Sequence, residues 1–188
     1  MTIIGITGTI GAGKGTIVDY LVRNKNFKHY SVRNYLLDVI KQRQIPVNRD
    51  SMVMVANELR EKNGNSFIIE QLVKSATRAN QNAVIESIRH PGEISALKKH
   101  PSFYLFSIDA DIKIRYERII KRGSETDQLN FEKFKQNEER EMSSENPSAQ
   151  NIKECIDGAD YFFNNNGDIE SLFKQIEAVL TTILRQDK

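Results

Sequence analysis

The sequence predicts an α/β fold of three layers, α/β/α, in which helices cover both faces of a five-stranded parallel sheet. Two observations lead to this prediction. Short apolar runs rich in β-branched residues alternate with longer segments of helical spacing, and this alternation is typical of βαβ units with right-handed crossovers. The 188 residues also contain no repeat and no Pro-, Gly- or Ser-rich linker. We therefore expect residues 1–188 to form a single domain.

Five short apolar segments have the pattern of buried parallel strands. They are residues 3–7, 27–30, 83–88, 103–108 and 161–163. Apolar residues at helical spacing predict helices between and after these strands. The expected helices cover residues 15–24, 31–42, 50–62, 66–80, 91–100, 111–122, 131–142 and 168–184.

Residues that favour helix ends support several of these bounds. Pro46 closes the second helix, since proline cannot continue its hydrogen-bond ladder. Gly64 is a typical stop for the third helix, and Ser66 is expected to cap the fourth. Pro91 suits the first turn of the fifth helix, where its missing N–H costs nothing.

Composition excludes several classes of protein. The 27 basic and 25 acidic residues give a net charge of +2, which argues against a dedicated nucleic-acid binder. The single cysteine, Cys155, excludes an internal disulfide and is expected to pack in the core. No apolar run reaches the ~20 residues of a membrane span, and the first residues lack the features of a signal peptide. We expect a cytoplasmic monomer or homodimer without nucleic-acid or membrane partners.

A glycine-rich loop carries the strongest functional signal. The segment GTIGAGKGT, residues 8–16, follows the first strand and opens the first helix, which is the context that a P-loop requires. Its glycines let backbone N–H groups converge on an anion, and the helix N-terminus adds positive charge. Lys14 can reach the β- and γ-phosphates. The residues predicted to bind the nucleotide are Gly11, Ala12, Gly13, Lys14, Gly15 and Thr16.

One position departs from the strict P-loop motif and gives the first resemblance. Gly15 stands where Ser or Thr usually follows the lysine, and the hydroxyl comes one residue later at Thr16. This GxxGxGKGT form resembles the nucleoside monophosphate kinases, adenylate kinase in particular. The resemblance implies the sheet order 2-3-1-4-5, ATP as donor and Mg²⁺. It also implies acceptor-binding helices at about residues 31–80 and a small lid at about residues 118–142.

The end of the third strand presents a carboxylate and an arginine. The segment VIESIR, residues 84–89, places Glu86 after β-branched residues, as a Walker B carboxylate that holds Mg²⁺ is placed. It resembles the Asp-Gly-Phe-Pro-Arg segment of adenylate kinases and the Asp-Gly-x-Arg segment of an uncharacterised archaeal kinase-like branch. Glu86 replaces Asp, and Ser87 replaces Gly. The resemblance implies that Arg89 clamps the acceptor's phosphate; the alternative is an ion pair at a strand end.

Further acceptor-binding candidates lie on the second and third helices. Residues 30–36, YSVRNYL, occupy the place of the Ser/Thr-Gly-Asp-x-x-Arg pattern of adenylate kinases. Ser31 matches its start, but Leu36 replaces the arginine. Arg33 lies three residues earlier on the same helix face and is the substitute candidate. Arg60 is another, because the archaeal branch also has an acidic-flanked Leu-Arg there; the alternative is an ordinary position on the helix surface.

One predicted helix carries Arg115, Arg118 and Arg122 at spacings of three and four, so they share a face. The pair Arg118 and Arg122 resembles the arginines that flank the lid of adenylate kinases, which implies contacts with the phosphates. The alternative is a solvated basic face. Residues 123–130 are interpreted as a short lid, and Arg140 is a further lid candidate. Most of the glutamate-rich run around Arg140 is expected to be plain helix surface.

The last predicted strand adds a second resemblance. The segment ADYFFNN, residues 159–165, resembles the Ala-Asp-x-x-Ile-x-Asn segment that closes the sheet in dephospho-coenzyme A kinases and in the archaeal branch. Residues 164–167 either contact the donor base or form a simple turn.

Together these resemblances imply ATP-dependent phosphoryl transfer to a nucleoside or deoxynucleoside monophosphate, giving the diphosphate and ADP. The residues expected to be catalytic are Lys14, Arg118, Arg122 and Arg89. Those expected to bind the phosphorylated acceptor are Ser31, Arg33, Arg60 and Arg89, and those expected to hold Mg²⁺ are Thr16 and Glu86. Two alternatives remain. One is a dephospho-coenzyme A kinase-like enzyme, and the other is a nucleotide-binding regulator or slow NTPase with no acceptor.

Overall fold

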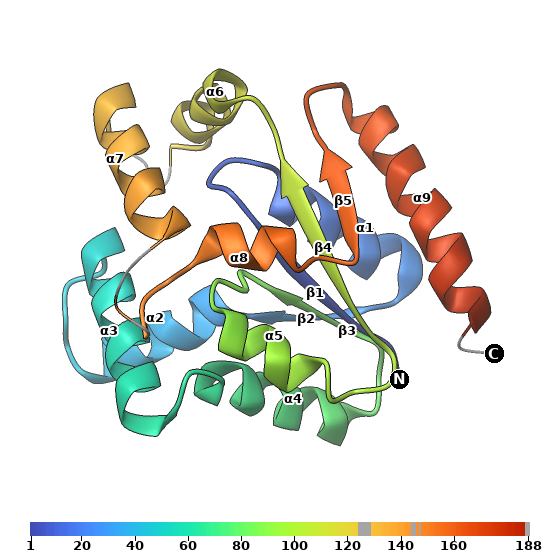
Figure 1. Cartoon of the computed structure of the whole chain (residues 1–188), viewed down its shortest axis with the longest axis horizontal. Helices are drawn as coiled ribbons and strands as arrows, with labels where there is room; N and C mark the ends of the chain where they lie inside the picture. Colours follow the sequence, from blue (N-terminus) through green and yellow to red (C-terminus); the bar gives the residue numbers. More distant parts are fainter. Residues whose placement is uncertain (124–128, 144–145, 147, 187–188) are drawn as a thin grey trace.

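The computed structural model contains one five-stranded sheet, and all of its strands are parallel (Figure 1). It describes residues 1–123, 129–143, 146 and 148–186. The strands are β1 (Ile3–Gly8), β2 (Lys28–Ser31), β3 (Ala83–Glu86), β4 (Phe103–Asp109) and β5 (Tyr161–Asn164). Their order is β2-β3-β1-β4-β5, with Ile3 paired to Ala83 on one side and to Phe103 on the other. The predicted fold class and strand order are confirmed.

The helices follow the predicted ranges with one addition. They are α1 (Lys14–Lys25), α2 (Val32–Gln42), α3 (Arg49–Asn63), α4 (Phe67–Ala79), α5 (Pro91–Leu97), α6 (Ile112–Arg122), α7 (Phe131–Met142), α8 (Ile152–Asp157) and α9 (Ile169–Gln186). The short helix α8 was not predicted, because six residues are too few to establish a helical period.

The helix caps agree only in part with the expectation. Ser31 accepts a hydrogen bond from the backbone N–H of Asn34 and so caps α2. Ser66 occupies the N-cap position of α4, but its side chain makes no capping bond. Its Oγ instead donates to Oε1 of Glu70 at 2.7 Å, so the predicted cap is wrong in its chemistry although right in its position.

Alternation along β1 sends its side chains into two separate cores. Ile3 packs on one face with apolar residues of α2, α3, α4 and α5 and with the buried Cys155 of α8. Ile4 and Ile6 pack on the opposite face against α1 and α9. Figure 1 shows the same division, with α9 and α1 on one side of the strands. The predicted three layers are therefore present, and the buried cysteine belongs to the core as expected.

A third, smaller cluster attaches the P-loop to α6 and α7. It contains Ile10, Ile119 and Phe134, and the rings of Tyr116 and Phe131 meet edge to face beside it at 5.2 Å. This cluster places α7 next to the carboxyl end of the sheet. Within the described residues, every helix is too short or too polar to cross a bilayer.

Candidate active site

The P-loop, residues 8–16, joins the carboxyl end of β1 to the start of α1. Its last turn requires glycine. Gly13 has a φ of +107°, and a Cβ at this position would lie 2.3 Å from Nδ2 of Asn165. A Cβ on Gly15 would meet nothing within 4 Å. The loop is thus packed against the protein at Gly13 and open at Gly15, where its backbone can receive a ligand.

Lys14 is folded back onto its own loop. Its Nζ donates to the carbonyl oxygen of Gly8 at 2.8 Å and to that of Thr9 at 2.6 Å. Burial of the ammonium and, after it, repulsion by Arg89 lower the pKa of Lys14 to about 7. A bound polyphosphate would supply the negative charge that this environment lacks.

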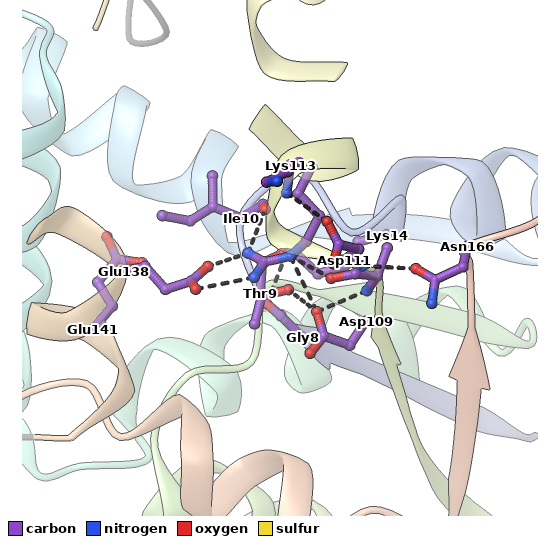
Figure 2. A network of polar contacts seen from close by, with 12 residues as sticks. Gly8, Thr9, Ile10, Lys14, Asp109, Asp111, Lys113, Glu138, Glu141 and Asn166 are labelled. Carbon is purple, nitrogen blue, oxygen red and sulfur yellow. Dashed lines mark hydrogen bonds and ion pairs between the residues drawn. The ribbon is translucent and has the colours of Figure 1, made fainter. Parts of the chain in front are cut away.

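A polar network anchors the P-loop to β4, α6 and α7 (Figure 2). Thr9 donates through its hydroxyl to Asp109, the last residue of β4. Nε of Arg115 lies 3.3 Å from the same carboxylate, and Nη1 donates to the carbonyl of Ile10 at 3.2 Å. Arg115 also pairs with Glu138 of α7 and is buried. It therefore braces the loop and does not belong to a solvated basic face.

The other side of the P-loop is held by Asn165, which follows β5. Its Nδ2 donates to the carbonyl of Ala12 at 2.7 Å, and its own carbonyl accepts from Nη2 of Arg118 at 2.9 Å. Nη1 of Arg118 is buried and meets no acceptor within the described part of the chain. Arg122 is exposed at the end of α6. The loop at 164–167 thus supports the P-loop through a side chain, a role that the sequence did not indicate.

The lid prediction is only partly covered by the structure. Residues 124–128, the centre of the expected lid, lie outside the described residues. On α7, the expectation of plain helix surface is wrong for two glutamates. Glu138 pairs with the buried Arg115, and the side chain of Glu141 is only 2% exposed. Both carboxylates pair with arginines of other elements; Glu141 is buried by its pair, and Glu138 stays partly exposed.

Glu86 and Ser31 meet because the parallel register pairs the ends of β3 and β2. Oε1 of Glu86 accepts from Oγ of Ser31 at 3.0 Å and lies 3.4 Å from Nε2 of His29. Burial alone would raise the pKa of Glu86, but His29, Ser31 and Lys14 together hold that pKa below its ordinary value. The carboxylate is therefore ionised at neutral pH. The hydroxyl of Ser31 thus donates to this carboxylate and accepts the capping hydrogen bond of α2.

The turn after β3 has a strained residue. Ser87 adopts a φ of +66°, in the left-handed region that favours glycine. Glycine is the residue that the resemblance to adenylate kinases leads us to expect here, and a serine in this conformation costs about 1 kcal/mol. The turn brings Arg89 toward the P-loop side of the sheet, and strain of this kind is common at functional sites.

Four arginines line one pocket, which we call the arginine pocket. Its lining residues are Val32, Arg33, Leu36, Arg49, Met52, Val53, Ala56, Arg60, Ser87, Arg89, Glu141 and Gln150. The structure thus brings together three of the four predicted acceptor-binding residues, Arg33, Arg60 and Arg89. Ser31 is not among the lining residues. Leu36, which replaces the usual arginine, contributes to the apolar wall instead.

Glu93 organises the arginine pocket from behind. It is fully buried, and its Oε1 accepts from Nε and Nη2 of Arg60 at 3.2 and 2.7 Å. Its Oε2 accepts from the backbone N–H groups of Arg89 and His90 at 2.9 and 3.1 Å. One carboxylate therefore fixes both the side chain of Arg60 and the turn that carries Arg89. Nη1 of Arg60 is buried and finds no acceptor among the residues that the structure describes.

Sequence reasoning missed Arg49 and Glu141. Arg49 is the first residue of α3, and its Nη2 lies 2.5 Å from Oε1 of Glu141; Arg89 pairs with the other oxygen of this carboxylate. Burial would raise the pKa of Glu141, but Arg89 and Arg49 hold it below its ordinary value. A signal for Arg49 existed, since a cation at the positive end of a helix dipole is unfavourable and needs a reason. Nothing local marks Glu141.

The arginine pocket and the P-loop are electrostatically adjacent. Arg89 and Arg49 lower the pKa of Lys14, whereas Glu86 and Glu141 raise it. A direct contact also joins the two sites, since the hydroxyl of Thr7 donates to the carbonyl of Ile88, the neighbour of Arg89, at 2.8 Å. The geometry therefore combines an anion-binding loop with a second cationic site beside it.

Comparison with known proteins shows the family of this chain. Residues 4–144 match the model of a family described as an AAA domain, AAA_18. The chain belongs to this family. Among the proteins similar to this AAA-domain chain is a UPF0200 protein of Methanothermobacter thermautotrophicus. It is 29% identical over 182 residues, which are 96% of this chain and 90% of the relative. A UPF0200 protein of Methanocaldococcus jannaschii is 28% identical and covers 98% and 91%. The predicted resemblance to an archaeal kinase-like branch is confirmed.

Solved structures similar to this AAA-domain protein show the same fold. TT1252 from Thermus thermophilus has a TM-score of 0.64 at 18% identity, covering 96% of this chain and 97% of the other. A gluconokinase from Sinorhizobium meliloti has a TM-score of 0.60 at 10% identity and covers 98% and 94%. A shikimate kinase from Aquifex aeolicus has a TM-score of 0.54 at 16% identity and covers 96% and 97%. The protein thus has the P-loop fold of small-molecule kinases.

Proposed function

We propose that this AAA-domain protein transfers a phosphoryl group from ATP to a nucleoside or deoxynucleoside monophosphate, giving the diphosphate and ADP. One observation carries the proposal. The arginine pocket lies beside the P-loop, because the hydroxyl of Thr7, directly before the loop, donates to the carbonyl of Ile88, directly before Arg89, at 2.8 Å. Phosphoryl transfer needs little more than a donor and an acceptor held in line and charges that stabilise the transferring group. An anion-binding loop beside a cationic pocket meets this need.

The P-loop is the donor site in this proposal. Backbone N–H groups of residues 11–16 surround the polyphosphate, and Lys14 leaves the carbonyls of Gly8 and Thr9 to pair with it. Arg118 offers to the transferring group its Nη1, which meets no acceptor among the described residues, and Arg122 joins it when the lid, at about residues 118–142, closes. Closure excludes water and so suppresses hydrolysis of ATP.

The arginine pocket is the acceptor site. Within the expected acceptor-binding region at about residues 31–80, α2 and α3 line the pocket and α4 packs against them in the core. The turn after β3 and Glu141 of α7 complete the lining. Arg89, Arg33 and Arg60 bind the acceptor's phosphate, and Arg49 joins them. A phosphate oxygen attacks without a general base, so the mechanism requires no histidine or carboxylate for proton transfer.

The residues present fit a magnesium ion that arrives with the nucleotide. Among the described residues there is no group of three or more His, Cys, Asp or Glu that could hold a metal by itself. Mg²⁺ on a nucleotide needs only one or two protein oxygens besides phosphates and water. Glu86 is an ionised carboxylate close to Lys14, and Thr16 offers a hydroxyl in the first turn of α1. Bound there, Mg²⁺ would neutralise charge between the phosphates.

The acceptor assay tests the function directly. Purified protein is incubated with Mg-ATP and, separately, each common nucleoside and deoxynucleoside monophosphate, dephospho-coenzyme A, shikimate and gluconate. We expect one or a few monophosphates to stimulate ADP formation and to appear as diphosphates. Stimulation by another compound alone would replace the proposed acceptor. Slow ATP hydrolysis that no compound changes would favour the nucleotide-binding regulator, and Lys14→Ala serves as the inactive control.

Arg89→Ala tests the division between donor and acceptor sites. Because Arg89 lies in the arginine pocket, its loss is expected to raise the KM for the acceptor by about tenfold or more and the KM for ATP far less. Arg78→Ala, which removes an exposed arginine of α4, is the matched control and is expected to leave both constants unchanged. Equal increases in both KM values would assign Arg89 to the donor site.

A further inference from the structure

Two adjacent residues of α7 pair with two adjacent residues of α3, and the charges are reversed between the pairs. Glu141 pairs with Arg49 at 2.5 Å, and Arg140 pairs with Asp50 at 3.0 Å. The pairs join positions about 90 residues apart in the chain, namely the helix after the lid segment and the helix that lines the arginine pocket. We call this double ion pair the α3–α7 clasp.

Only the Glu141 half of the clasp enters the arginine pocket. Its Oε1 is taken by Arg49 and its Oε2 by Arg89, and the side chain is 2% exposed. Figure 2 shows it on the same helix as Glu138. The Arg140–Asp50 half is open to solvent, with 45% and 81% of the two side chains exposed. An anionic group with two oxygens, each on a different guanidinium, therefore already sits where an acceptor's phosphate is expected.

The pocket has more positive charge and more donors than Glu141 uses. Four arginines face two carboxylates, Glu141 and the buried Glu93 behind Arg60, which leaves a surplus of two positive charges. Nε of Arg49 and Nη1 of Arg60 are buried, and neither meets an acceptor within the part of the chain that the structure describes. A phosphoryl dianion brings a second charge and a third oxygen, so it can use donors that a carboxylate leaves unused.

We propose that Glu141 is an internal occupant of the phosphoryl subsite and that the acceptor's phosphoryl group displaces it, opening the α3–α7 clasp. The proposal rests on the proposed function in that the displacing group belongs to the acceptor. Displacement requires a dianion. A free monocarboxylate has the same charge as the Glu141 side chain, but Glu141 is covalently part of the protein and is therefore favoured at this position. The pocket thereby selects phosphorylated acceptors, and its occupation releases α7, which follows the lid segment.

Inorganic phosphate is the probe, with acetate as the monocarboxylate control, and calorimetry measures binding in a buffer free of other oxyanions. Glu141→Gln removes the competing charge and is expected to bind phosphate about tenfold more tightly than the wild type. Glu139→Gln, an exposed neighbour on α7, is the matched control with unchanged affinity. Acetate is expected to bind neither the wild type nor Glu139→Gln at the same concentrations, because in both proteins the Glu141 carboxylate already occupies the subsite. Unchanged affinity in folded Glu141→Gln overturns the proposal.

Arg140→Gln separates displacement from simple repulsion by Glu141. This change removes a positive charge near the pocket, so electrostatics alone predicts weaker phosphate binding. Loosening the clasp predicts the opposite sign, an increase of about twofold, because an exposed pair contributes little. Tighter binding supports the proposal and weaker binding overturns it. The test also holds if Glu141→Gln does not fold, since Arg140 lies outside the arginine pocket.

Hydrogen exchange provides the structural measurement. Phosphate is expected to increase amide exchange in residues 131–142 of the wild type, and Glu141→Gln is expected to show that increase without phosphate. Unchanged or slower exchange in α7 on phosphate binding would mean that Glu141 stays in place, which overturns the proposal. Failure of the proposed function has a different signature, namely no acceptor in the ATP assay while phosphate still opens the clasp.

Discussion

Lys14 of the P-loop and the nearby Glu86 are ionisable residues of opposite sign, and their pKa values respond differently to burial. The pKa of Glu86 is held below its ordinary value by His29, Ser31 and Lys14 despite burial. The pKa of Lys14 falls to about 7, because burial and Arg89 outweigh Glu86 and Glu141. In the free protein the nearby negative charge is too small to keep Lys14 fully charged at neutral pH. The phosphates of a bound nucleotide would favour the charged form.

We predict that nucleotide binding takes up a proton. At pH 8 Lys14 is mainly neutral in the free protein, and a polyphosphate raises its pKa by favouring the charged form. Uptake should approach one proton per nucleotide at pH 8 and vanish near pH 6, where the lysine is already charged. Calorimetry in two buffers of different ionisation enthalpy measures this number. Lys14→Met is the control, and equal uptake in that variant would assign the proton to another group.

Replacement by alanine should affect stability differently at two glycines of the P-loop, Gly13 and Gly15. At Gly13 an alanine Cβ would meet Asn165, and the φ of +107° is unfavourable for any L side chain, so Gly13→Ala should lower the free energy of unfolding by more than about 1 kcal/mol. Gly15→Ala places its methyl in open space within α1 and should leave stability equal or raise it slightly. Urea unfolding compares them; a stable Gly13→Ala would contradict the packing of Asn165.

Contacts between elements decide where the arginine pocket forms. Arg60 of α3 and Glu93 of α5 form an ion pair whose side chains are 1% and 0% exposed. The carboxylate of Glu93 can be buried because it accepts four hydrogen bonds, two from the guanidinium of Arg60 and two from backbone N–H groups. Substitution on either side therefore disturbs α3, α5 and the turn after β3 together.

Arg60→Met should destabilise the protein by about 3 kcal/mol or more, since it leaves Glu93 buried without its partner. Arg43→Met is the matched control, because it breaks an Arg–Glu pair with Glu58 that is partly exposed. We expect a much smaller loss there. Denaturant unfolding at neutral pH measures both variants, and similar losses would show that the buried pair has no special role.

The elements were predictable from the sequence where a period or a cap marked them. α8 was not, because it is short and lies between irregular segments. Helix α7 was predicted, but the burial of Glu141 was not, because glutamate on a helix is usually exposed. Glu141 pairs with Arg49, which is 92 residues away in the sequence, and a local sequence pattern cannot reveal a contact at that separation.

At the scale of the whole molecule, the sheet and its two cores followed from the alternation of strands and helices together with the resemblance to kinases. The P-loop was predictable because its chemistry is contained in nine consecutive residues. The arginine pocket was predictable only by half. Arg33, Arg60 and Arg89 fell within recognisable motifs, whereas Arg49, Glu141 and Gln150 are brought in by tertiary packing.

The support of the P-loop by Asn165 also concerns how the protein is made. The hydrogen bond from Asn165 to Ala12 joins positions 153 residues apart, and β1 has its two neighbours in strands that are synthesised much later. Translation runs from the N-terminus at about 5–20 residues per second. The glycine loop therefore leaves the ribosome several seconds before its last support, and a nascent chain shorter than 165 residues has the nucleotide motif without the scaffold that shapes it.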